Sequence, residues 1–136
     1  MTFIDTGAWI ALYDRKDQYH KDACSIFREL RRQRERLYTT DFVIDETVTR
    51  LRYDAGHLAA VEFLDAIEGA EEKNTVTVVA IDEGLFGQAK RLFRRYSSER
   101  LSFTDCTSFV VCQVYGISAA FAFDRHFPIM GISLLQ

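Results

Sequence analysis

Apolar residues recur along this chain in two patterns, at helical spacing in long segments and without interruption in short ones. The long segments predict helices, because a period of 3.6 residues places apolar side chains on one face. The short segments are rich in β-branched and aromatic residues and predict strands. The expected helices cover residues 8–13, 19–36, 42–53, 57–70, 83–96 and 104–115, and the expected strands cover residues 3–4, 37–39, 75–81, 119–123 and 132–134.

Strands and helices alternate along the chain, and this order is typical of the α/β class. It predicts a parallel central sheet covered by helices on both faces, a three-layer α/β/α arrangement. Seven glycines and a single proline leave few interruptions, and the sequence has no linker, repeat or low-complexity segment. We therefore expect residues 1–136 to form a single domain.

The composition is that of an ordinary globular protein, with 48% hydrophobic and 27% charged residues among 136. These figures exclude a disordered chain and a disulfide scaffold. Three cysteines stand without zinc-type spacing and are expected to be buried free thiols. No apolar run is long enough to span a bilayer and no secretory signal is visible, so a cytoplasmic protein without membrane contact is expected.

Acidic residues stand where the predicted sheet would form a binding site. Asp5 and Asp124 directly follow strands, and Asp105 opens a helix. Ligands bind outside the carboxyl ends of parallel strands, so these three side chains are expected to converge there. Each also has a structural explanation, as a helix cap for Asp5 and Asp105 and as a turn residue for Asp124. Glu46 lies early in its helix and could reach the same edge, but a helical wheel does not separate it from Asp41 or Asp45.

A group of carboxylates close to the core favours a bound cation. Carboxylates in such a place repel one another and raise each other's pKa values, and a divalent cation relieves that repulsion. No histidine or cysteine is expected in the group, so the cation should be hard and oxygen-loving, Mg²⁺ or Mn²⁺ rather than zinc. His126, next to Asp124 in the sequence, is interpreted as a residue outside the site.

Four segments carry the acids in one order along the chain: residues 3–8 (FIDTGA), 43–47 (VIDET), 101–108 (LSFTDCTS) and 121–127 (FAFDRHF). In their order and spacing these segments resemble the motifs of the PIN-domain nucleases, and they are most similar to the VapC-type toxins of bacterial toxin–antitoxin pairs. The resemblance extends over essentially the whole chain. Two positions depart from the family pattern, because Gly7 replaces a small polar residue and Ala122 replaces a threonine.

The resemblance implies a PIN-like fold and a metal-dependent endoribonuclease that uses Mg²⁺ or Mn²⁺. It assigns the catalytic and metal-binding roles to Asp5, Glu46, Asp105 and Asp124, and it gives the hydroxyl of Thr104 a supporting role beside the metal ligands. It also implies a homodimer and a cognate antitoxin protein whose tail blocks the acidic site with an arginine or lysine.

An acidic site repels RNA, so cations near it must hold the substrate. The net charge is only −3, but residues 90–100 carry a local charge of +4 just before Asp105. Arg94, Arg95, Arg100 and Arg125 are the candidate RNA-binding residues, although a solvated helix face explains the charge of this segment equally well. Five further arginines between residues 28 and 36 are interpreted as a solvated face.

Other functions stay open at this point. A housekeeping PIN-domain nuclease for RNA processing, and a PIN domain that only binds RNA or a protein partner, fit the same motifs. Residues 4–8 (IDTGA) also resemble the aspartic-protease signature, but that fold is all-β and the long helical segments contradict it. A phosphoryl-accepting signalling domain requires adjacent acids after its first strand and a facing lysine, and neither is evident. The RNA target, the number of metal ions and the role of the acidic segment 54–72 do not follow from the sequence.

Overall fold

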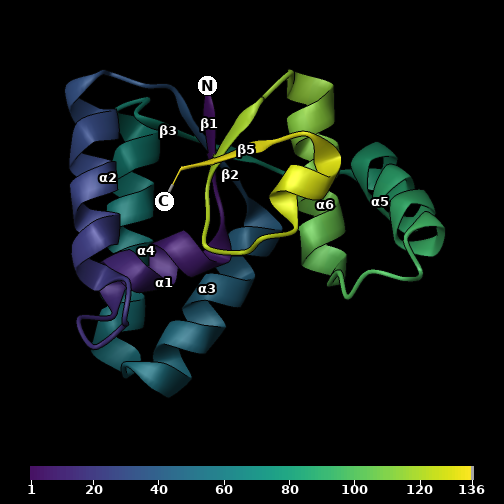
Figure 1. The fold of residues 1–136 in the computed structure, drawn as a ribbon. Coiled ribbons are helices and arrows are strands. Elements are labelled where there is room, and N and C mark those ends of the chain that lie inside the picture. The colour runs from purple at the N-terminus through teal and green to yellow at the C-terminus, as the bar shows by residue number, and fades with distance from the viewer. Residues whose placement is uncertain (136) are drawn as a thin grey trace.

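A five-stranded sheet forms the centre of the protein in the computed structural model, which describes residues 1–135. All strand pairs are parallel, and the strand order is β3-β2-β1-β4-β5 (Figure 1). The apolar residues of the central strand β1 are fully buried, as expected of a parallel strand covered on both faces. The strands are β1 (Thr2–Ile4), β2 (Leu37–Thr40), β3 (Val76–Val79), β4 (Ala119–Phe121) and β5 (Ser133–Leu135).

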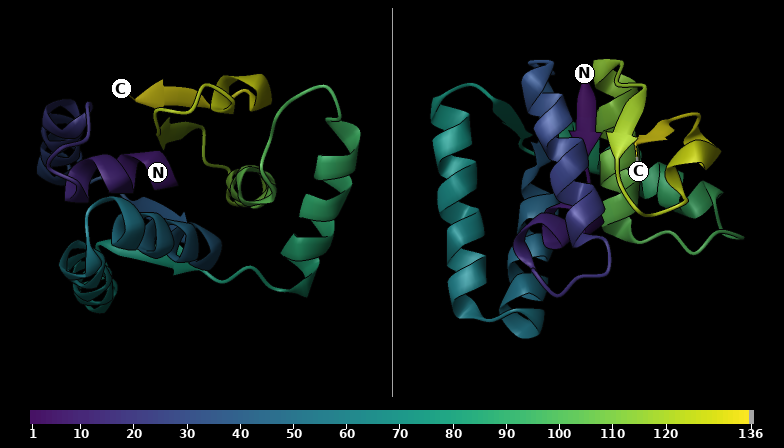
Figure 2. Two further views of the ribbon diagram at one scale, coloured as in Figure 1. Left: turned by 90° about the horizontal axis from the view of Figure 1, so that it is seen from below. Right: turned by 60° about the vertical axis from the view of Figure 1, so that its left-hand side comes forward.

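Helices cover both faces of the sheet. Viewed along the strands, α1, α2 and α4 lie on one side and α5 and α6 on the other, while α3 crosses below the carboxyl ends of the strands (Figures 1 and 2). The predicted three-layer α/β/α architecture is therefore confirmed. The helices are α1 (Thr6–Tyr13), α2 (His20–Arg32), α3 (Asp41–Asp54), α4 (His57–Glu72), α5 (Glu83–Arg95), α6 (Phe103–Tyr115) and a short 3₁₀ helix, η1 (Phe127–Met130).

Short polar side chains fix where the helices begin. Thr40 accepts a hydrogen bond from the N–H of Val43 at the start of α3, and Asp82 accepts one from the N–H of Leu85 at the start of α5. Each bond satisfies a backbone donor that the first helical turn leaves without a partner. α6 ends at Gly116, whose φ of +68° is readily adopted only by a residue without a side chain.

Some predicted boundaries and orientations are wrong. The helix expected over residues 19–36 ends at Arg32, because Arg34 takes a φ of +54° that no α-helix allows. The strands expected over residues 75–81 and 119–123 are shorter, since pairing ends at Val79 and Phe121. Phe93, expected to face inward, is 48% exposed on α5. Of the cysteines, two are buried free thiols, whereas Cys24 is only half-buried.

The core runs along both faces of the sheet and holds the strand ends in place. On the α1 side, the indole of Trp9 donates a hydrogen bond to the hydroxyl of Thr39, which itself donates to the carbonyl of Ile4. This chain of contacts ties α1 to the ends of β2 and β1, where the candidate site begins. Within residues 1–135, the structure contains no helix that combines the length and the apolar character needed for a membrane span.

Candidate active site

The acidic residues gather at the carboxyl edge of the sheet. Asp5 directly follows β1, and its backbone N–H donates to the carbonyl of Phe121 at the end of β4. Asp124 lies three residues beyond β4, and Asp105 lies in the first turn of α6. Neighbouring parallel strands end side by side, so the sheet itself brings the first and last of these acids together.

Asp5 is the most buried of the acids, with 5% of its surface exposed. Its carboxylate caps no helix, although the residue occupies the N-cap position of α1. Burial, together with the negative charges of Asp105, Asp124 and Glu46, raises the pKa of Asp5 from 3.8 to about 7, although a hydrogen bond from the N–H of Thr6 offsets part of the rise. The carboxylate therefore lies in an environment that disfavours its charge unless a cation is nearby.

Asp105 takes part in a reciprocal cap at the start of α6. Its N–H donates to the hydroxyl of Ser102, and its Oδ2 accepts from the N–H of Ser102, both at 3.0 Å. This capping box fixes the orientation of the carboxylate. Burial, followed by the charges of Asp124 and Glu46, raises the pKa of Asp105 in spite of these bonds. Asp105 is therefore both a capping residue of α6 and a member of the acidic site.

His126 joins the acidic group, which corrects the expectation that no histidine does. Asp105, Asp124 and His126 each offer a ligand atom, and these atoms lie within 4.8 Å of one another. The Nδ1 of His126 is 2.6 Å from Oδ1 of Asp124, and its backbone N–H donates to the same oxygen at 2.9 Å. The tight turn after β4 folds the imidazole back onto the acid. Zinc was excluded because no histidine was expected in the group. Since an imidazole is a good ligand for transition metals, that reason no longer holds.

The structure separates the three acids at the start of α3. Glu46 is half-buried, and it lies close enough to the site for its charge to raise the pKa of both Asp5 and Asp105. Asp45 is exposed. Asp41 accepts hydrogen bonds from the N–H groups of Phe42 and Ile81 and thereby joins α3 to the segment after β3.

The two hydroxyl residues before Asp105 have different places. Thr104, the expected supporting residue, is half-buried, and within residues 1–135 its hydroxyl makes no hydrogen bond. Ser102, which was not among the residues expected at the site, is the hydroxyl residue that contacts Asp105. Its signal was present, because a serine three residues before an acid at a helix start is typical of a capping box.

The candidate RNA-binding arginines are all exposed. Arg94 and Arg95 lie in the last turn of α5, and Arg100 lies in the loop that leads to α6. This loop joins the lower ends of α5 and α6 on the right of Figure 1. Arg125 lines a small pocket of about 300 Å³ together with Phe123, Tyr19 and Asp22.

Comparisons with known proteins agree with this geometry. The sequence pattern of the PIN domain matches residues 2–132. The chain belongs to the PIN-domain family. This PIN domain is 33% identical over 131 residues to the 23S rRNA-specific endonuclease VapC20 of Mycobacterium tuberculosis, an alignment that covers 96% of the chain and 95% of that protein. It is also 32% identical to a VapC ribonuclease of Archaeoglobus fulgidus, over 81% of the chain and 69% of that protein.

A solved structure supports the assignment to the PIN-domain family. The crystal structure of Mycobacterium tuberculosis VapC20, described as a sarcin–ricin loop cleaving toxin, matches this PIN domain with a TM-score of 0.83 and 31% identity. The match covers 97% of this chain and 96% of that one. The chain is therefore a VapC-type PIN-domain nuclease, and the resemblance stated from its four motifs is confirmed.

Proposed function

We propose that this protein is a metal-dependent endoribonuclease that hydrolyses phosphodiester bonds in RNA and is the toxin of a VapBC-type toxin–antitoxin pair. The observation that carries the proposal is the convergence of Asp5, Glu46, Asp105 and Asp124 at one edge of the sheet, with Asp5 almost fully buried. The relatives named as an rRNA endonuclease and a ribonuclease support the choice of RNA as substrate.

The donor set fits a divalent cation. Asp105 and Asp124 each direct one carboxylate oxygen to the backbone, through Oδ2 and Oδ1 respectively, and within residues 1–135 their other oxygens accept no hydrogen bond. The buried hydroxyl of Thr6, next to Asp5, also has no hydrogen-bond partner in this part of the chain. Carboxylate and hydroxyl oxygens without hydrogen-bond partners are suitable ligands for Mg²⁺ or Mn²⁺.

In this proposal Asp5, Glu46, Asp105 and Asp124 hold the cation. When bound, a divalent cation at such a site binds phosphate oxygens, promotes the formation of hydroxide from water and neutralises developing charge. Ser102 holds Asp105 in position, and His126 does the same for Asp124. Arg94, Arg95, Arg100 and Arg125 attract the RNA backbone to an edge that is otherwise acidic.

The remaining predictions are part of the same proposal. We infer that residues 1–136 form a single PIN domain that acts in the cytoplasm, where its RNA substrate is found. We also propose that the protein is a homodimer and that a cognate antitoxin inserts an arginine or lysine among the four acids. A basic side chain there would relieve the same repulsion that a cation relieves.

The test is a cleavage assay with a structured fragment of 23S rRNA, the RNA named for VapC20, beside duplex DNA of the same length. Each is incubated with Mg²⁺, Mn²⁺ or EDTA, with wild-type protein and the Asp5→Asn variant. We expect cleavage of RNA alone, only with metal, and only by the wild type. Cleavage that persists in EDTA or in Asp5→Asn would contradict the assigned site.

A second readout separates a nuclease from a PIN domain that only binds. If Mg²⁺ or Mn²⁺ raises the melting temperature of the wild type but not of Asp5→Asn, and no RNA is cut, the metal site exists without catalysis. The toxin role is tested by expression in bacteria with and without the product of a neighbouring gene. Growth arrest that this product relieves supports the toxin, whereas unaffected growth favours a housekeeping nuclease.

A further inference from the structure

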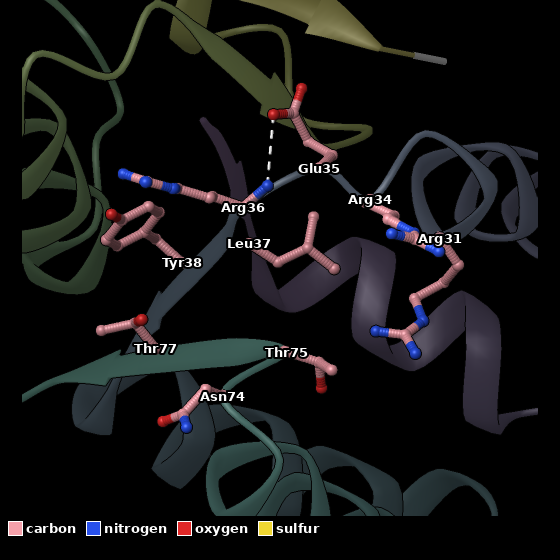
Figure 3. A pocket seen from close by; sticks show the side chains of 9 residues that line it. All are labelled: Arg31, Arg34, Glu35, Arg36, Leu37, Tyr38, Asn74, Thr75 and Thr77. Atoms are coloured by element: carbon pink, nitrogen blue, oxygen red, sulfur yellow. Dashed lines mark hydrogen bonds between the residues drawn. The ribbon is translucent and has the colours of Figure 1, made fainter.

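A second polar cavity lies at the opposite edge of the sheet, where β2 and β3 begin. It has a volume of about 570 Å³, within the usual range for small-ligand sites. Leu37, 1% exposed, lies between its two ends (Figure 3). The other lining residues come from the end of α2, from β2 and from the start of β3: Arg31, Arg34, Glu35, Arg36, Tyr38, Asn74, Thr75 and Thr77.

The cavity carries a net positive charge that the fold itself does not neutralise. Within residues 1–135, no carboxylate lies within ion-pair distance of Arg31, Arg34 or Arg36. The single acid of the lining, Glu35, is already paired with the N-terminal ammonium at 2.8 Å. Its carboxylate points away from the other lining side chains, and its contact with the N–H of Arg36 is drawn as a dashed line in Figure 3.

The arginines approach the cavity from two sides. In Figure 3 the guanidinium groups of Arg31 and Arg34 lie beyond one side of Leu37, and that of Arg36 lies on the other side, beside the ring of Tyr38. Two separated cationic positions fit a ligand with more than one phosphate or carboxylate group. Thr77 and Asn74, at the start of β3, add a hydroxyl and an amide to the lining, whereas the hydroxyl of Thr75 donates to the carbonyl of Ala70.

From this arrangement we propose that the cavity binds phosphoryl groups, with Arg31 and Arg34 at one position and Arg36 at a second. Guanidinium groups donate paired hydrogen bonds that match phosphate oxygens, whereas a merely solvated helix face needs no cavity. The phosphates come either from RNA, in which case the cavity is a second contact for the substrate and rests on the proposed function, or from a free nucleotide. Arg32, also at the end of α2, pairs with Glu29 and does not line the cavity.

The experiment compares two triple variants with the wild type. The first carries Arg31→Gln, Arg34→Gln and Arg36→Gln. The control carries Lys21→Gln, Arg28→Gln and Arg32→Gln, which removes three exposed charges from α2 outside the cavity. Binding is measured in EDTA by fluorescence anisotropy with a labelled 23S rRNA fragment, and by calorimetry with GDP and with inorganic pyrophosphate.

If RNA supplies the phosphates, the cavity variant binds the fragment at least about tenfold more weakly than the control variant. The slope of log affinity against log salt concentration then falls by about 2 more than in the control, since three cationic contacts are lost. If a free nucleotide supplies them, GDP or pyrophosphate binding is lost in the cavity variant alone and RNA binding follows the control. Equal binding of RNA, GDP and pyrophosphate by both variants overturns the proposal.

The proposal that the cavity binds RNA can be disproved independently of the proposed nuclease activity. The cavity variant is expected to keep its maximal rate on a short RNA at saturating concentration, because its arginines lie at the edge of the sheet opposite the four acids. A wild type that cuts no RNA would remove the nuclease proposal, while the pyrophosphate and GDP measurements would still decide the cavity. A changed oligomeric state of the cavity variant in gel filtration, with all binding unchanged, would assign the arginines to a protein interface and overturn the proposal.

Discussion

The two edges of the sheet carry opposite charges and bear them in different ways. At the carboxyl edge, the charge lies on short acidic side chains, and Asp5 is nearly excluded from water. At the amino edge, the charge lies on long arginine side chains that remain exposed around an open cavity. A buried carboxylate costs free energy until it is neutralised, whereas an exposed guanidinium keeps its hydration and costs little. The acidic edge therefore needs a cation, and the basic edge is only ready to bind an anion.

The local backbone adds to this difference. Asp105 lies at the N-terminus of α6, where the helix dipole favours negative charge, and Arg31 lies in the last turn of α2, where it favours positive charge. Both edges thus have a partial stabilisation that does not depend on any ligand. It does not suffice at the acidic edge, where burial still raises the pKa of Asp105.

The largest expected effect separates two neighbouring acids of α3. Glu46→Gln removes a carboxylate whose charge acts on Asp5, and we expect RNA cleavage to fall by about 1,000-fold, which corresponds to roughly 4 kcal/mol of transition-state stabilisation. The matched control is Asp45→Asn at an exposed position, for which the rate should stay within about twofold. The rates are measured in single-turnover assays. Similar losses in both variants would mean that Glu46 has no special role in the site.

The cost of the buried acid predicts a pH-dependent stability in metal-free protein. With the pKa of Asp5 raised to about 7, the native state holds a proton that the unfolded state releases above pH 4. The free energy of unfolding therefore decreases as pH rises from about 4 to 7 and stays low above that range. Asp5→Asn should remove this loss, and raise the free energy of unfolding by up to about 4 kcal/mol at pH 8 but by less than about 2 kcal/mol at pH 5.

Denaturant unfolding in EDTA at the two pH values measures this effect. The Asp45→Asn variant serves as the control and should show no such difference between them. If Asp5→Asn raises the free energy of unfolding equally at pH 5 and pH 8, the ionisation of Asp5 is not what destabilises the metal-free protein.

An intermediate effect is expected at His126, which contacts Asp124 and is a positioning residue in our proposal. His126→Gln should reduce the cleavage rate by about 10- to 100-fold, as is usual when a partner of a metal ligand is lost. It should also raise the Mg²⁺ or Mn²⁺ concentration needed for half-maximal rate. His57→Gln, on an exposed histidine at the start of α4, is the control. An unchanged metal requirement would show that the imidazole acts only in packing.

The smallest effect is expected for the exposed cations of α5. Changing Arg94 and Arg95 to glutamine together should weaken RNA binding several-fold and reduce the salt slope by about 1.5. The control pair is Lys21→Gln and Arg28→Gln on α2. Equal salt slopes for the two double variants would mean that Arg94 and Arg95 belong to a solvated helix face and do not bind RNA.

The elements and the order of motifs were readable from local patterns. The burial of the strands, the caps at Thr40 and Asp82 and the four acidic segments follow from side chains a few residues apart, and local spacing determines such features. Ser102 belongs with them, because its capping partner is only three residues away. The helix end at Arg32 was missed because arginine and glutamine are good helix formers, while the chain turns there to enter β2.

The sequence by itself thus determined the class of fold, the family and the chemical nature of the acidic edge. Only the tertiary structure decided which acid of α3 lies close enough to act on Asp5, that His126 folds back onto Asp124, and that three of five arginines surround a cavity. These features depend on how distant segments pack against one another. Periodicity gives the face of a helix to within about one turn, but a ligand site depends on atoms a few ångströms apart, and packing alone sets those distances.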